Sequence, residues 1–261
     1  MADLARTLLA PILLAQGRRM FRTMPRLGEP HGDRDGTVGS GSPLRLLLTG
    51  DSSAAGVGVG TQGEALLGQV TGRIAQTHQV TYSLWARHGS TIPGTLRFVR
   101  KQDPEAVDAA VVVVGLNDVL AGRALGPWMD GYRELVGTLQ TRFEARHVVV
   151  SGLPPIGAFP ALPQPLRWVI GRQARRHDTA LHAWADAEAG VSYVSVLPQS
   201  GEPLADVPVP EVMSRDGFHP GPRVYAEWGR RIAATLAASG IGAASETGPA
   251  PETHAPEAGD G

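Results

Sequence analysis

Short apolar runs alternate with longer segments of helical periodicity through most of the chain. Runs such as AAVVVVG and HVVVSG are rich in β-branched residues, which is typical of strands buried on both faces. Strands that alternate with helices predict a parallel sheet with helices on both sides. The expected strands are 44–49, 80–86, 109–114, 147–151 and 191–196, and the expected helices are about 62–77, 92–102, 127–145, 164–189 and 221–238.

Two segments flank this alternation. Residues 28–43, GEPHGDRDGTVGSGSP, have the composition of a linker. Residues 239–261 are rich in Gly, Ala, Pro and Glu and hold too little apolar surface to offset the entropy of ordering, so we expect a disordered tail. The part between them, residues 44–238, is long enough to bury one α/β core.

The N-terminal segment, residues 1–27, contains an apolar run at 8–15 that is too short to span a bilayer, which takes about 20 residues. An acid among the first residues, a missing small-x-small cleavage site and two arginines after the run make a poor secretion signal, which favours a cytoplasmic location. We expect an amphipathic helix, broken or kinked near Pro11. Three interpretations stay open: a helix packed on the domain, an interfacial anchor with peripheral membrane contact through residues 4–20, and a cleaved signal.

Charge and composition exclude several classes of function. A formal net charge of -1 leaves no basic excess for nucleic acid. The chain has no cysteine, so disulfides, thiolate nucleophiles and Cys-ligated metals are excluded. No two histidines have H-x-x-x-H spacing, so no metal site is expected, and His177 and His182 are assigned to the solvated face of a helix. The oligomeric state is left open.

Glycines and polar residues gather where the expected strands end. GDSS follows the first strand, HGST the second and GLND the third, while DGFHPG precedes the last helix. Ligands of open α/β sheets bind outside the carboxyl ends of the strands. Residues from distant segments are therefore expected on one rim of the sheet, where they can share one site.

The segment TGDSSAAGVGVG, residues 49–60, allows more than one interpretation. Its glycines complete neither the Walker pattern nor G-x-G-x-x-G, although a flavodoxin-like phosphate loop and a serine-rich helix cap stay open. A nucleophilic serine needs a base and an orienting acid. Asp216 and His219 are three residues apart in a turn, so the carboxylate can accept from one ring nitrogen and leave the other for a serine.

These blocks, in this order and over residues 44 to about 238, resemble those of the SGNH (GDSL-type) hydrolases. The resemblance implies a flavodoxin-like, three-layer α/β/α fold with a five-stranded parallel sheet in the order 2-1-3-4-5. It also implies catalysis without a cofactor. Two positions depart from common members: Ser53 stands where the GDSL block has Leu, and His88 precedes the glycine of the second block.

The same resemblance assigns roles to individual residues. Ser52 would be the nucleophile, His219 the base and Asp216 the acid that orients it. The oxyanion hole would consist of the backbone N–H groups of Ser52 and Gly89 and the side-chain amide of Asn117.

The expected activity is that of a serine esterase acting on short- to medium-chain carboxylic esters through an acyl-enzyme. Thioesterase, lysophospholipase or acyltransferase activity of the same family, and a non-catalytic flavodoxin-like binding module, are the alternatives. The proline-rich segment 152–168 begins at the active rim, and its apolar side chains either wall an acyl pocket or pin the loop to the core. The expected substrate-binding residues are His88, Phe159, Leu162 and Trp168.

Overall fold

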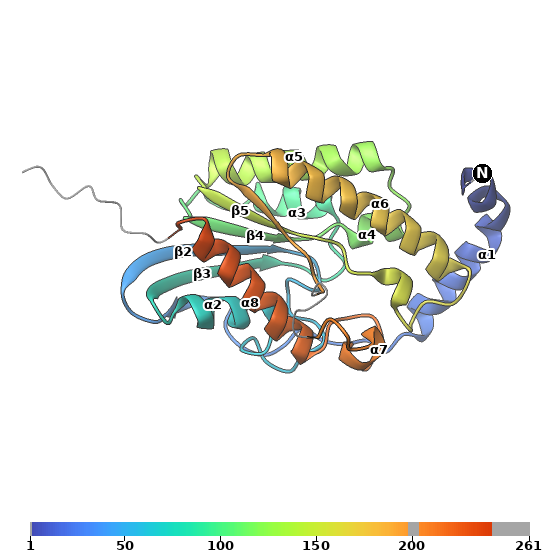
Figure 1. Cartoon of the computed structure of the whole chain (residues 1–261), viewed down its shortest axis with the longest axis horizontal. Helices are drawn as coiled ribbons and strands as arrows, with labels where there is room; N and C mark the ends of the chain where they lie inside the picture. The colour runs from blue at the N-terminus through green and yellow to red at the C-terminus, as the bar shows by residue number, and fades with distance from the viewer. Residues whose placement is uncertain (1, 198–203, 242–261) are drawn as a thin grey trace, which may run out of the picture.

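The computed structural model describes residues 2–197 and 204–241, and its central sheet lies between two layers of helices (Figure 1). The sheet has six strands in the order β1-β3-β2-β4-β5-β6, and all neighbours pair in parallel except β1 and β3. The strands are β1 (Asp35–Val38), β2 (Ser42–Gly50), β3 (His78–Ala86), β4 (Ala109–Val113), β5 (His147–Ser151) and β6 (Val191–Val194). The helices are α1 (Ala2–Thr23), α2 (Leu66–Ile74), α3 (Ile92–Val99), α4 (Leu116–Leu120), α5 (Leu125–Arg142), α6 (Leu166–Ala187), α7 (Val209–Val212) and α8 (Pro222–Ala238), with a short 3-10 helix at Ile156–Ala158.

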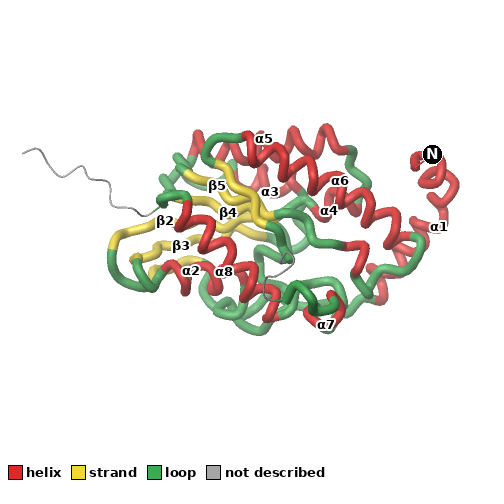
Figure 2. The backbone as a smooth tube through the Cα atoms, in the orientation of Figure 1, coloured by secondary structure: helices red, strands yellow, loops and turns green. Residues whose placement is uncertain are grey.

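The three-layer α/β/α prediction is confirmed, with one strand more than expected. The five expected strands are β2 to β6, and their expected order corresponds to the observed β3-β2-β4-β5-β6. Helices α3, α5 and α6 lie on one side of these strands, and α2 and α8 lie on the other (Figure 2).

The additional strand corrects the prediction that residues 28–43 are a linker. Asp35–Val38 forms β1, which pairs antiparallel with β3 at the edge of the sheet. Its side chains are mostly exposed, so main-chain pairing rather than burial holds it in place. Four residues with one apolar side chain do not produce a recognisable strand pattern, which is why composition alone indicated a linker.

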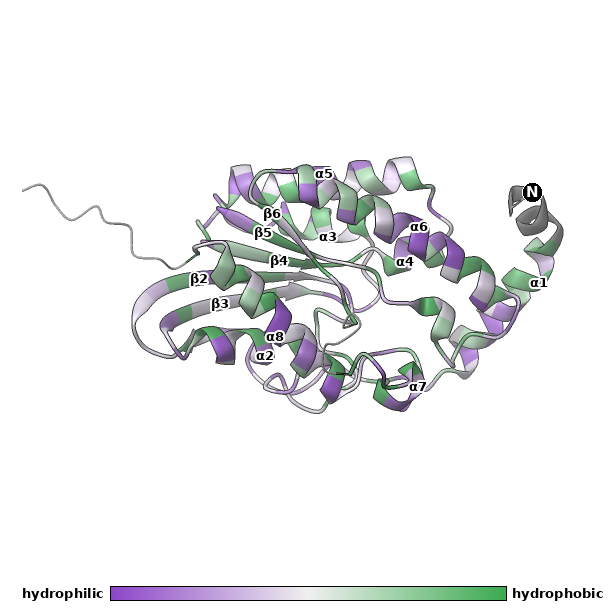
Figure 3. Cartoon of the chain, in the orientation of Figure 1, coloured by the Kyte–Doolittle hydropathy of each residue, from purple (hydrophilic) through white to green (hydrophobic). Residues whose placement is uncertain are grey.

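Side chains alternate between the two faces of the sheet, as the apolar runs predict. On β2, Leu46 and Leu48 pack with Trp228 of α8, whereas Leu47 packs with Trp128 of α5. The hydropathy colouring shows apolar residues along the central strands and hydrophilic ones on the outer turns of α5 and α6 (Figure 3). The two resulting cores fix β2 and β4, whose carboxyl ends carry the candidate site.

The N-terminal segment forms one helix, α1, that continues through Pro11, so of the expected break or kink there the break is wrong. Its second half is attached to the domain, because Met20 is buried in the core cluster beside α5 and α6. Within residues 2–197 and 204–241, no helix is long and apolar enough to cross a membrane. Of the expected tail, residues 242–261 lie outside the described residues.

Candidate active site

The turn after β2 presents Ser52 at the carboxyl edge of the sheet. Gly50 adopts a φ of +153°, and a Cβ atom there would lie 1.8 Å from the carbonyl oxygen of Val113, so only glycine fits. The backbone N–H of Asp51 donates to the same oxygen at 2.9 Å, which ties the turn to β4. The carboxylate of Asp51 accepts from the N–H of Ser53 at 3.0 Å, so it holds the turn around Ser52.

Three predicted residues meet in one hydrogen-bonded chain. The Oγ atom of Ser52 lies 3.0 Å from Nε2 of His219. On the other side of the ring, Nδ1 of His219 lies 2.6 Å from Oδ2 of Asp216. Ser52, His219 and Asp216 are all buried, although 167 positions separate the serine from the histidine.

The turn before α8 keeps the acid charged. Oδ1 of Asp216 accepts from the backbone N–H groups of Phe218 and His219, each at 2.9 Å. Burial alone would raise the pKa of Asp216, but hydrogen bonds from the ring and backbone of His219 and from Phe218 outweigh it and lower the pKa below its ordinary value. A carboxylate held ionised in this position fixes the orientation of the imidazole.

Of the residues predicted for the oxyanion hole, Asn117 lines the cavity beside Ser52, and Gly89 follows His88, whose ring centroid lies 5.8 Å from that of His219. Gly89 has a φ of +73°, a left-handed conformation that favours glycine, in the loop after β3. Within the described residues, the backbone N–H groups of Ser52 and Gly89 have no hydrogen-bond acceptor. The side-chain amide of Asn117 donates one N–H to the carbonyl of Ser90 at 2.9 Å, and the amide carries a second N–H.

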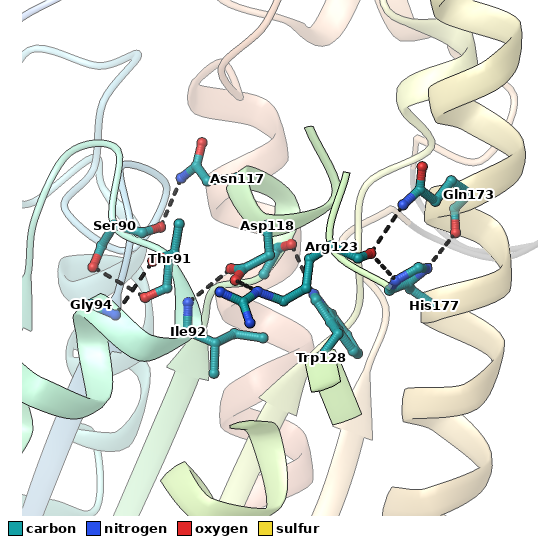
Figure 4. A network of polar contacts seen from close by, with 11 residues as sticks. Ser90, Thr91, Ile92, Gly94, Asn117, Asp118, Arg123, Trp128, Gln173 and His177 are labelled. Atoms are coloured by element: carbon teal, nitrogen blue, oxygen red, sulfur yellow. Dashed lines mark hydrogen bonds and ion pairs between the residues drawn. The ribbon is translucent and has the colours of Figure 1, made fainter. Parts of the chain in front are cut away.

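Asp118 holds the oxyanion side of the site in place through its contacts with Ile92 and Arg123 (Figure 4). Its Oδ2 atom accepts from the N–H of Ile92 at the start of α3, at 2.8 Å. Its Oδ1 atom pairs with Nε of Arg123 at 2.8 Å. Since Asn117 and Ser90 precede Asp118 and Ile92 in the chain, the carboxylate fixes α4 relative to the loop that carries Gly89.

The network continues to α6, where one prediction is wrong. His177 is buried rather than solvated, and its ring packs edge-on against Trp128 with centroids 5.1 Å apart. Its ring nitrogens lie 2.8 Å from the carbonyl of Gln173 and 3.2 Å from that of Arg123 (Figure 4). The two arginines that precede His177 in the sequence are exposed on α6. Their charges indicated a solvated face, although His177 itself is buried. His182 is half-exposed, as expected, and lies 3.4 Å from Asp186.

A small apolar cavity of about 40 Å³ opens beside Ser52. Phe159 lines it, as predicted, whereas Leu162 is buried outside it and Trp168 is 47% exposed on α6. Trp168 is wrong as a wall because its position on α6 turns the ring toward Arg172. Several other apolar residues of the lining were not predicted, among them Leu116, Leu153 and Phe218. The first two follow the ends of β4 and β5, where ligands of such sheets bind.

His88 is exposed at the edge of the site, with its ring centroid 5.8 Å from that of His219. Partial burial and the neighbouring His219 lower its pKa from the ordinary value. Burial raises the pKa of Asp51 to about 7, against the opposing effects of its hydrogen bond from Ser53 and the charge of His219. Within residues 2–197 and 204–241, no cluster of three metal-ligating side chains occurs.

Comparison with known proteins shows the family of the chain. The sequence profile of the GDSL-like lipase/acylhydrolase family matches residues 48–227, so the chain belongs to that family. A GDSL-like esterase from Mycobacterium tuberculosis is 31% identical over 198 residues, and the match covers 70% of this chain. The chain spans 58% of the length of that relative.

Solved structures share the fold at low sequence identity. A lipolytic protein of the G-D-S-L family from Veillonella parvula has a TM-score of 0.53 at 16% identity, over 74% of this chain and 96% of that one. A carbohydrate acetylesterase family member from Sinorhizobium meliloti has the same TM-score and identity, over 74% and 97% of the two chains. At this identity the likeness establishes the fold.

Proposed function

We propose that the protein is a serine esterase that hydrolyses short-chain carboxylic esters through an acyl-enzyme. The chain of contacts from Ser52 through His219 to Asp216 carries this proposal, because it joins a nucleophile, a base and an orienting acid in the order that acyl transfer requires. Family membership supports the reaction class. Every step uses groups that this chain supplies.

In the first half-reaction, Oγ of Ser52 attacks the ester carbonyl carbon while Nε2 of His219 takes the hydroxyl proton. The C–O bond to the alcohol then breaks, and His219 returns the proton to the departing alkoxide oxygen. In the second half-reaction, water gives a proton to His219 and attacks the acyl carbon, and Ser52 leaves with that proton. Asp216 stays ionised and stabilises the imidazolium of both halves.

The negative charge of each tetrahedral intermediate needs donors on one side of Ser52. The N–H groups of Ser52 and Gly89, which have no acceptor in the described part of the chain, and the second amide hydrogen of Asn117 would supply them. Donors fixed before the reaction stabilise developing charge without reorganisation. The Asp118 network gives them that rigidity.

The size of the cavity supports short acyl chains. A volume of about 40 Å³ exceeds the roughly 10–15 Å³ that a single water molecule needs and is far below the roughly 300–1,000 Å³ of pockets for drug-sized ligands, which favours a short acyl group. Each methylene buried there would contribute about 0.8 kcal/mol. The acetylesterase name of one structural neighbour is compatible with this size.

A series of p-nitrophenyl esters from two to sixteen carbons tests the proposal. We expect kcat/KM to peak at short chains and to fall once the acyl group exceeds the cavity. Phe159→Ala should move the peak to longer chains, whereas Leu162→Ala, a buried residue outside the cavity, should leave it in place. An unchanged chain-length profile in Phe159→Ala would show that Phe159 does not limit the length of the acyl pocket.

Two further arms address the other activities. Acyl-thioester substrates of the same chain lengths distinguish a thioesterase, and lysophospholipid distinguishes a lysophospholipase. If the protein hydrolyses none of these substrates and binds a flavin tightly, the result would instead support a non-catalytic binding module.

A further inference from the structure

An open apolar groove, separate from the catalytic cavity, lies between α1, the start of α6 and the end of α4. It encloses about 660 Å³, and its apolar lining includes Leu13, Leu14, Leu120, Leu166, Val169 and Ile170. Leu14 is 62% exposed and Ile12, elsewhere on α1, is 49% exposed. An apolar surface of this kind on a soluble domain marks an interaction site rather than ordinary surface composition.

The groove stays open because the second half of α1 is the part that holds this helix to the domain. The side-chain amide of Gln16 donates to the carbonyl of Gln164 at 2.6 Å and accepts from the N–H of Leu166 at 3.1 Å. Met20 is buried one turn later. The first half of the helix projects beyond the sheet and the start of α6 (Figure 1), and Ile12 and Leu14 are exposed.

The charges at the groove identify what can cover it. Arg18 and Arg22 line it, and no carboxylate does so in the described part of the chain. Neither these arginines nor Arg19 forms an ion pair within the described residues, and all three are exposed. Four arginines against one aspartate give α1 a charge of +3, whereas the whole chain carries -1.

Apolar residues followed by unpaired arginines match the two zones of a bilayer surface. Acyl chains take up leucine and isoleucine side chains, while arginines reach the phosphates at the level of the head groups. Attachment to an anionic bilayer surface strengthens with buried apolar area and with electrostatic attraction, so leucines beside arginines suit contact at the interface.

The groove is also close to the catalytic cavity. Leu116, the first residue of α4, lines the cavity beside Ser52, and Leu120, its last residue, lines the groove. These two residues are four positions apart on one helix, which corresponds to about 6 Å along its axis. Contact at the groove would therefore bring the catalytic edge of the sheet close to the same surface.

We propose that α1 and the neighbouring turns of α4 and α6 form a docking surface for a bilayer that contains anionic phospholipids. Leu13, Leu14 and Val169 enter the acyl region, and Arg18 and Arg22 contact phosphate groups. The proposal concerns attachment to the membrane and does not depend on which ester the catalytic site hydrolyses.

Co-sedimentation of the full chain with phospholipid vesicles tests this proposal. We expect binding to vesicles of phosphatidylcholine with about one third phosphatidylglycerol, and much weaker binding to phosphatidylcholine alone. Binding should weaken as salt rises, because surface charge interactions are screened. Arg18→Gln combined with Arg22→Gln should reduce the partition coefficient about tenfold or more, since each basic residue near an anionic surface contributes about 1 kcal/mol.

Matched variants separate the surface from general effects. Leu14→Asp should abolish binding, whereas Val38→Asp, which places the same charge at an exposed apolar residue of β1, should not. Arg97→Gln, at an exposed arginine of α3, is the control for charge. Hydrolysis of a soluble ester should be the same in all of these variants, which shows that each one is folded.

Three results would overturn the proposal. The first is no binding to either vesicle, and the second is equal binding by the groove variants and their controls. The third is a dimer in analytical ultracentrifugation that Leu14→Asp dissociates, because a second copy of the chain would then cover the groove.

Discussion

The two halves of the candidate site are built in different ways. The acid–base half, Asp216 and His219, occupies one short turn, and a single long-range contact joins it to Ser52. The oxyanion half takes Gly89 and Asn117 from the loops after two strands. Side chains of α4 and of the segment before α5, with a backbone N–H at the start of α3, fix them. Local turn geometry therefore positions the base, whereas a network distributed over the fold positions the charge-stabilising donors.

This difference predicts how each half responds to substitution. Loss of a group in the acid–base half removes a chemical step, so its effect is large and local. The oxyanion half should also respond to residues that never touch substrate, because the positions of its donors depend on their support.

Ser52→Ala should lower kcat by roughly 10⁴-fold or more, because no other group can form the acyl-enzyme. Ser53→Ala, at the adjacent residue, should retain most activity, since the turn uses the backbone N–H and carbonyl of Ser53, which alanine keeps. Steady-state rates on p-nitrophenyl acetate, with circular dichroism to confirm folding, measure both. An active Ser52 variant together with an inactive Ser53 variant would reverse the assignment.

Asn117→Ala should lower kcat by roughly 10²–10³, the usual effect of losing one oxyanion donor. KM should change little, because the contact is strongest in the transition state. A change confined to KM would place Asn117 in ground-state binding and would contradict its role as a donor.

Asp118→Asn should lower kcat by about tenfold with KM unchanged, through displacement of Asn117 and the loop that carries Gly89. The amide can still accept from the N–H of Ile92 but loses the ion pair with Arg123. Arg123→Gln should have a similar effect, and the double variant should be no worse than the poorer single one.

The control for this pair is Asp130→Asn, which makes the same change in an exposed ion pair on α5. The control should leave kcat unaltered. Purely additive losses in the double variant would show that Asp118 and Arg123 do not act together.

Asp51→Asn tests the nucleophile turn through stability. Burial raises the pKa of Asp51 to about 7, so the folded state holds a proton that the unfolded chain releases near pH 3.8. The contribution of Asp51 to the free energy of unfolding therefore falls as the pH rises from 3.8 to about 7, and it stays low at higher pH. The variant should raise Tm by a few degrees at pH 8 and by less at pH 4, as measured by calorimetry; an equal change at both would contradict a raised pKa.

Much of the fold could be predicted because its signals are local. The β-branched runs of β4 and β5 predict the strands of the sheet. The segments between strands, which glycines and prolines bound, predict the helical layers. The edge strand Asp35–Val38 was missed because its stability comes from pairing with β3 and not from its own side chains.

The site shows the same limit. Ser52, Asp216 and His219 could be named because they stand in short motifs, and the structure brings them together. The contacts of Asp118 with Arg123, and the burial of His177, depend on how α4 and α6 pack, which no spacing in the sequence specifies.

The central claim is that Ser52 is the activated nucleophile, and covalent labelling tests it most directly. The wild-type protein would be treated with a fluorophosphonate and digested, and the modified residue located by mass spectrometry. We predict one label per chain on the Oγ atom of Ser52 and no label in Ser52→Ala. Label on Ser53 or another residue, or an unlabelled wild-type protein that still hydrolyses esters, would contradict the account.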